Sequence, residues 1–182
     1  MPKYLIIIST YSVGNGIFIG NDIAMRYSYK QARETLAQYA YSEGFIEVLF
    51  DYDGVSTLFN NHLDPIYVPR RIKIEGKYDY EHQTYLMLHE LGHHELRKDW
   101  EAFKAEFPIT AKAEEFKSRG YERKFRRRKS YFVASFEEEY RAWDEGKKLA
   151  EEFEIPIHFE RWNRLRTDCL FNYMKYYSQL RN

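Results

Sequence analysis

The sequence has one cysteine among its 182 residues, no excess of either charge and no long apolar run. A single cysteine, Cys169, excludes an intramolecular disulfide and a zinc site built from cysteines. Cationic and anionic side chains number 28 each, so a global role in binding polyanions is not implied. The apolar run at 5–8 is shorter than the ~18 residues of a membrane span and the roughly 7–15 of a secretory signal. We therefore expect a cytoplasmic protein with no membrane partner.

Aromatic residues are abundant, with 17 Tyr and 13 Phe, and hydrophobic residues make up 44% of the chain. Aromatic side chains bury a large area each, so a chain of this length can build a firm core. The length suits one domain, and no linker or repeat divides it. We expect a single domain over 1–182.

The first half has the pattern of a small sheet with one helix. Apolar and β-branched runs predict strands at 4–8, 45–50 and 66–74. Ser28 and Gln31 form a capping-box pair that predicts a helix over 29–42, and Gly44 should end it. Pro69 has no N–H to donate, which favours an edge position or a bulge in the strand 66–74.

The second half is predicted to be helical. Helices are expected at 80–97, 100–107, from 110 into a basic run, at 136–154 and at 160–180. Their expected N-terminal signals are Asp79, Thr110 and the capping box of Ser135 with Glu138. The last helix carries an apolar stripe of Trp162, Leu165, Cys169, Tyr173, Tyr176 and Leu180. The predicted fold class is α+β.

The segment His89-Glu90-Leu91-Gly92-His93 has the HExxH pattern, inside the helix expected at 80–97. Residues four apart lie on one face of a helix, so both imidazoles can reach one metal ion. Glu90 points to an adjacent face, where its carboxylate can hold a water and take its proton. The pattern therefore predicts a metal site with His89 and His93 as ligands and Glu90 as general base.

This segment resembles the active-site helix of the zincin metallopeptidases. The resemblance implies a Zn²⁺ ion, hydrolysis of peptide bonds and a protein or peptide substrate. In that superfamily an extended substrate pairs with a strand at the sheet edge beside the cleft, a position similar to that of 66–74. A tyrosine or histidine often stabilises the oxyanion there, and the sequence does not single one out.

A catalytic zinc takes three protein ligands, so one remains to be assigned. In the metzincin arrangement, Leu96 and Asp99 stand where that family has its glycine and its last histidine. Asp99 could bind zinc, but Leu96 does not allow the sharp turn that brings the third ligand back. The DNA-repair SprT-type zincins use a third histidine soon after the motif, whereas the only later histidine here is His158.

The gluzincin arrangement uses a glutamate on a later helix, and three are candidates: Glu137, Glu138 and Glu139. Glu139 shares a face with the small or flat residues Ala142, Trp143 and Gly146. Such residues would let this helix approach the helix of the HExxH segment closely. The string Glu-x-x-Ala-Trp-x-x-Gly is similar to third-ligand helices in small zincins related to the ImmA/IrrE peptidases. We predict Glu139 as third ligand, Glu138 as a capping residue and Glu137 as a surface charge.

The remaining notable residues have simpler interpretations. His94 cannot share the face of His93 and is expected in a supporting or surface position, and His82 as an ordinary histidine or at the cleft rim. The run Lys117–Lys129 has 8 Lys or Arg in 13 residues, a pattern that could give weak contact with nucleic acid or an acidic protein. Two alternative functions stay open: a zincin-fold binding or regulatory protein with structural zinc, and a nucleic-acid-associated protein acting through this run.

Overall fold

The computed structural model describes residues 19–51, 57–59, 70–117 and 128–179. Within them the protein is α+β and mostly helical, as the sequence predicts. In chain order the elements are α1 (Ile19–Ser42), β1 (Phe45–Asp51), β2 (Thr57–Phe59), β3 (Arg70–Glu75), α2 (Tyr80–Lys98), α3 (Trp100–Glu106), α4 (Pro108–Lys117), α6 (Lys129–Glu152) and α7 (Phe159–Gln179). The strand expected at 4–8 lies outside the described residues.

The three strands form one mixed sheet in the order β1-β3-β2. β3 pairs in parallel with β1, with Val48 opposite Ile72, and in an antiparallel sense with β2, with Leu58 opposite Ile72. Of the two positions predicted for this strand, the edge is wrong, because β3 lies between β1 and β2. The ladder is irregular at the start of β3, where the register shifts between Phe45 and Glu47 of β1. The proline that suggested an edge precedes the described strand, so it removes no donor from the ladder within β3.

The first helix is longer than predicted. α1 begins at Ile19, so Ser28 and Gln31 lie inside it and do not cap it. Its end is as expected: Gly44 has a φ of 86°, the left-handed conformation that glycine adopts most readily after a helix. A serine with a glutamine three residues later also occurs within helices, which explains the error.

The helices α2 and α4 begin at residues that suit the start of a helix. Asp79 caps α2 by accepting a hydrogen bond from the backbone N–H of His82 at 2.9 Å. α3 ends before Pro108, as predicted, but α4 starts at that proline, because proline fits the first helical position. Thr110 is therefore not the cap; its hydroxyl donates to the backbone carbonyl of Phe107 at 3.1 Å.

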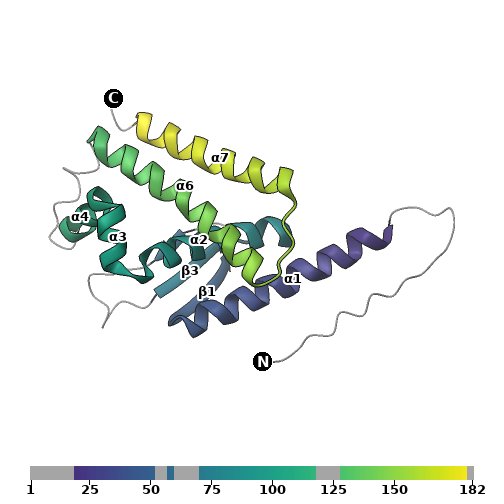
Figure 1. Cartoon of the computed structure of the whole chain (residues 1–182). Coiled ribbons are helices and arrows are strands. Elements are labelled where there is room, and N and C mark those ends of the chain that lie inside the picture. Colours follow the sequence, from purple (N-terminus) through teal and green to yellow (C-terminus); the bar gives the residue numbers. More distant parts are fainter. Residues whose placement is uncertain (1–18, 52–56, 60–69, 118–127, 180–182) are drawn as a thin grey trace.

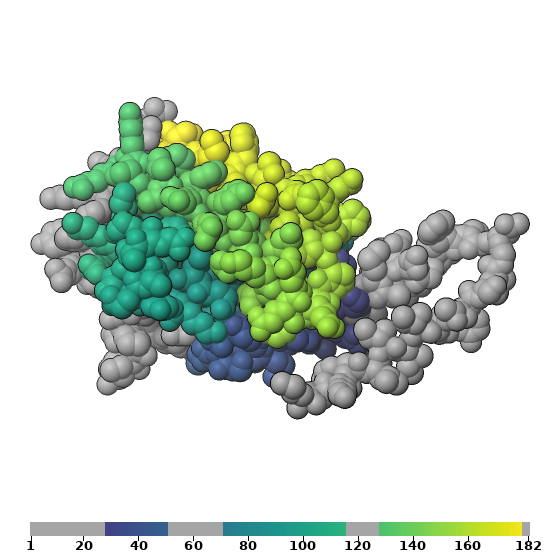
Figure 2. All heavy atoms as spheres, in the orientation of Figure 1, coloured from purple at the N-terminus to yellow at the C-terminus, as the bar shows by residue number. Residues whose placement is uncertain are grey.

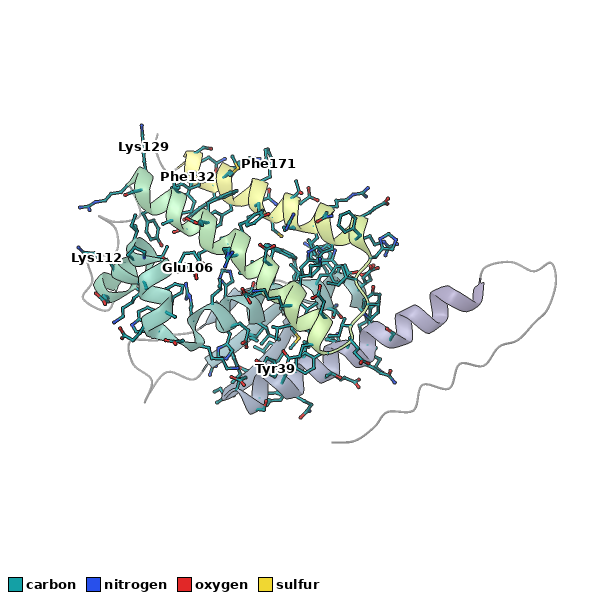
Figure 3. The ribbon with its side chains drawn as sticks, in the orientation of Figure 1. Tyr39, Glu106, Lys112, Lys129, Phe132 and Phe171 are labelled. Atoms are coloured by element: carbon teal, nitrogen blue, oxygen red, sulfur yellow. The ribbon has the colours of Figure 1, made fainter. Side chains whose placement is uncertain are left out.

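The long helix α6 also begins earlier than predicted, at Lys129. Ser135 and Glu138 therefore lie inside the helix and are buried, so the capping box predicted there is wrong. α6 and α7 lie side by side along one face, with α3 and α4 against the first part of α6 (Figure 1). Glu106 at the end of α3 faces α6 (Figure 3), and its carboxylate is 3.2 Å from the guanidinium of Arg141.

The core lies around α2, which α1, the sheet, α6 and α7 surround. In the space-filling view α3, α4, α6 and α7 form a continuous face with α1 beneath it (Figure 2). The most deeply buried apolar side chains come from all these parts, including Leu36, Ile72, Ile74, Met87, Leu88, Leu91 and Trp143. None of the helices described carries an apolar stretch long enough to cross a membrane. α2 is thus the buried helix against which the other elements pack.

Candidate metal centre

The HExxH segment lies in the middle of α2, in its most buried part. His89, Glu90 and His93 are only 6%, 6% and 9% exposed. Burying ionisable side chains is costly unless each one is paired, so three of them within five residues require partners nearby. The two imidazole rings lie 4.7 Å apart, centroid to centroid, on the same side of the helix. The histidine pair predicted from the spacing is therefore present.

α2 and α6 cross at backbone contact, which brings the second half of the site within reach. A Cβ atom added at Gly92 would lie 2.0 Å from the carbonyl oxygen of Ala142, and one at Gly146 would lie 2.5 Å from that of Leu88. No side chain larger than hydrogen fits at either position. Beside this crossing the indole of Trp143 stacks on the ring of His89, with centroids 4.4 Å apart and planes 16° apart.

The crossing places Glu139 directly against the histidine pair. Its Oε2 lies 3.3 Å from Nε2 of His89 and 3.3 Å from Nε2 of His93. Two ligand atoms bound to one zinc ion at about 2.0 Å, in a tetrahedral arrangement, would be roughly 3.3 Å apart. One potential ligand atom from each residue lies within 4.8 Å of the others. The structure thus brings together the three residues that the sequence analysis named, in a group that could hold a metal ion.

The charges of the site favour a cation at this point. Burial opposes the charge of Glu139, but the facing imidazoles of His93 and His89 hold its pKa well below the usual range. Burial would lower the pKa of His93, yet the carboxylates of Glu139 and Glu138 raise it to about 10. A carboxylate oxygen facing two imidazole nitrogens is stable only with a proton or a metal ion between them. The donor set of two imidazoles and one carboxylate fits zinc.

The structure does not bring the alternative ligands to this point. Asp99 caps the start of α3, where its carboxylate accepts from the N–H groups of Glu101 and Ala102. Glu137 is exposed, as predicted. Glu138 is buried and pairs with Arg97 of α2, so it stands beside the histidine pair and serves no cap.

A cleft of about 840 Å³ opens from the three converging residues. Glu90 lines it, and the opposite wall comes from α7, including Leu165, Asp168, Cys169, Phe171, Asn172 and Tyr173. Figure 3 shows Phe171 projecting from α7 at the top of the view, and it is 63% exposed. No sequence feature pointed to this wall, because the stripe on α7 was expected to be core. That expectation holds for Trp162; Leu165 is buried but also borders the cleft, Cys169 and Tyr173 are partly buried in its wall, and Tyr176 is exposed. Leu180 lies outside the described residues.

Three other predicted positions are now placed. His82 lies in the cleft, stacked on the ring of Tyr78 at 3.9 Å, where burial lowers its pKa against the effect of nearby carboxylates. Cys169 is partly buried in the cleft wall, and burial raises the pKa of its thiol to about 12. His94 is buried, not on the surface, and its Nε2 is 3.1 Å from Glu43.

Glu43, His94 and Glu95 form a second group with converging ligand atoms. The ammonium group of Lys98 lies 3.0 Å from the carboxylate of Glu43 and 3.5 Å from that of Glu95. A cation from the chain itself therefore already neutralises these carboxylates, and we interpret the group as an ion-pair network that joins α2 to α1.

Replacing Glu139 should weaken metal binding by a large factor. In Glu139→Ala the ion loses one of its three protein ligands. If the ligands share a binding free energy on the order of 10 kcal/mol, the loss is about a third of it. That loss corresponds to roughly a hundred- to thousandfold weaker affinity. Competition with a chromophoric chelator measures the change. Glu137→Ala, on the same helix but exposed, is the matched control and should keep the wild-type affinity. Equal affinities in Glu139→Ala and wild type would contradict this ligand set.

Comparison with known proteins gave no match, whether to family models, to curated proteins or to solved structures.

The basic run at 117–129 lies almost wholly outside the described residues, and Glu114, which precedes it, pairs with Arg97 at 2.8 Å.

Proposed function

We propose that the protein is a zinc-dependent metallopeptidase with a zincin-like, gluzincin-type site. The proposal rests on one observation above all: Oε2 of Glu139, on α6, lies 3.3 Å from Nε2 of both His89 and His93, on α2. It is supported by the position of Glu90, a buried carboxylate next to the first histidine that lines the same cleft. The histidine pair and a carboxylate are a ligand set that leaves one position for water or substrate.

A zinc ion bound there would polarise the scissile carbonyl and acidify the attacking water. Glu90 accepts the proton of that water as its oxygen attacks the carbonyl carbon. The same carboxyl group then gives the proton to the amide nitrogen as the C–N bond breaks. The second proton of the water, left on the new carboxyl group, passes to the amine, so a carboxylate and an ammonium product leave. Tyr173 and His82 line the cleft and could donate a hydrogen bond to the oxygen that becomes negatively charged.

The substrate would be a peptide in extended conformation. A strand at the edge of a sheet offers backbone groups with which such a peptide can pair. Because β3 is central, we assign this role to β2, which is antiparallel to β3 and contacts α2, the helix that carries the histidine pair. The cleft between α2 and α7 is large enough for several side chains of such a peptide.

The proposal predicts one zinc ion per chain and metal-dependent hydrolysis of peptides. Elemental analysis of protein purified without chelators should give a zinc stoichiometry near one, and an unbiased peptide library analysed by mass spectrometry should reveal cleavage. Removing the metal should abolish cleavage and restoring zinc should return it. A stoichiometry near zero that added zinc does not change would contradict the proposal. Full occupancy without any cleavage would favour a structural metal in a binding protein.

A further inference from the structure

Arg97 and Glu138 form a buried ion pair beside His93, and the mechanism above leaves it without a role. Arg97 follows His93 by one turn of α2. Its Nε donates to Oε1 of Glu138 at 2.9 Å, and its Nη2 donates to the same oxygen. Its Nη1 is 2.8 Å from Oε1 of Glu114 on α4. All three guanidinium nitrogens therefore bind carboxylates of the protein, so Arg97 is not available to bind a substrate carboxylate although it borders the cleft.

Glu138 and Glu139 face opposite nitrogens of the same imidazole. Glu139 lies at Nε2 of His93, whereas Oε1 of Glu138 lies 3.5 Å from Nδ1. A neutral imidazole that offers the lone pair of Nε2 to a metal carries its proton on Nδ1, and that N–H needs an acceptor. Glu138 supplies an acceptor in that position, only 4% exposed.

The arginine explains why these neighbouring glutamates do not exchange roles. Two adjacent carboxylates, one buried and one partly buried, repel each other, and each is stabilised by a cation of its own. Arg97 provides that cation for Glu138 and holds its carboxylate away from the point where the two Nε2 atoms converge. Glu139 is then left to face them.

We propose that Glu138, held in place by Arg97, is a positioning residue for His93: its carboxylate accepts a hydrogen bond from Nδ1–H and so fixes the tautomer and ring orientation that present Nε2 to the metal. The inference rests on the proposed function, because it assumes that this group of residues binds zinc. A purely structural pair would join α2 to α6 without affecting the metal.

The first test compares zinc affinities of the full-length protein by chelator competition. We expect Glu138→Met, which keeps the length of the side chain but has no oxygen to accept a hydrogen bond from His93, and Arg97→Met each to lower the affinity by about 10- to 100-fold. The double variant should lose no more than the weaker-binding single variant, because the arginine acts through the glutamate. Glu137→Met is the matched control and should bind zinc as the wild type does.

The second test detects the proton itself. In the cobalt(II)-substituted protein, the ligand imidazole N–H protons give exchangeable, paramagnetically shifted NMR signals. The signal of His93 should be protected from exchange in the wild type and exchange quickly in Glu138→Met. A merely structural pair would leave this signal unchanged. Melting temperatures of the metal-free variants separate a loss of affinity from a general loss of folding.

The outcomes distinguish the two proposals. If wild-type protein binds no zinc, the proposed function fails and this inference fails with it. If the wild type binds zinc but Glu138→Met stays within twofold of it, with an unchanged N–H signal, only the inference is overturned. Additive losses in the double variant would overturn the part assigned to Arg97.

Discussion

Glu90→Gln should retain its zinc and lose nearly all peptidase activity. Glutamine keeps the size and one acceptor oxygen of the side chain but cannot take a proton from water. General base catalysis typically contributes about 10²- to 10⁴-fold, so kcat on any peptide found to be cleaved should fall by that range. Elemental analysis together with single-turnover kinetics measures both properties in one preparation.

The control for this substitution lies on the same helix. Glu95→Gln removes a carboxylate that binds Tyr39 and Lys98 on the far side of α2, so it should leave hydrolysis unchanged and lower stability slightly. A Glu90→Gln protein that cleaves at the wild-type rate, or that loses its metal, would show that Glu90 does not have the role of base.

Gly92→Ala should damage both the fold and the metal site. In an ordinary helix interior this change stabilises by up to about 1 kcal/mol, because alanine has the higher helix propensity. Here the new Cβ would lie 2.0 Å from a backbone carbonyl oxygen of α6, so the two helices must separate. We expect a loss of about 3 kcal/mol or more in the free energy of unfolding, of the kind that overpacking a core produces. Urea denaturation of the metal-free protein measures it.

The same separation should weaken zinc binding, since Glu139 is carried by α6 and the histidines by α2. Gly44→Ala is the matched control: its added Cβ meets nothing within 4 Å, and only the φ of 86° opposes it. It should cost about 1 kcal/mol in stability and leave zinc affinity as it is. Wild-type stability in Gly92→Ala would mean that the helices are not in contact at this point.

The sequence predicted the features that depend on short spacing. Helix geometry places the two histidines, four residues apart, on one face. It also places Glu139, Ala142 and Gly146 on a shared face, and a glycine such as Gly44 marks where a helix such as α1 stops. The three wrong caps, at Ser28, Thr110 and Ser135, share one cause. A serine or threonine near a helix start has the same local pattern as one within a helix, and burial in the tertiary structure decides between them.

Contacts between distant residues could not be predicted. Arg97 and Glu138 are 41 positions apart, and either could equally have been a surface charge. The stripe on α7 has regular helical spacing throughout, yet its beginning packs in the core and its later part borders a cleft. The helical spacing of apolar residues shows which face of α7 turns toward the protein, but it does not show whether that face packs against other side chains or borders a cavity.

The position of α7 has a consequence for how the activity could diversify. None of the three converging residues comes from this helix, which is held to the rest of the protein through Trp162, Leu165 and Tyr177. Its exposed cleft positions, Asp168, Phe171 and Asn172, can therefore change in size or charge without disturbing the metal geometry. Under the proposed function, α2 and α6 would supply the metal ligands and the general base, whereas these exposed positions of α7 would contact the peptide, so the choice of peptide could be altered without changing the ligand set.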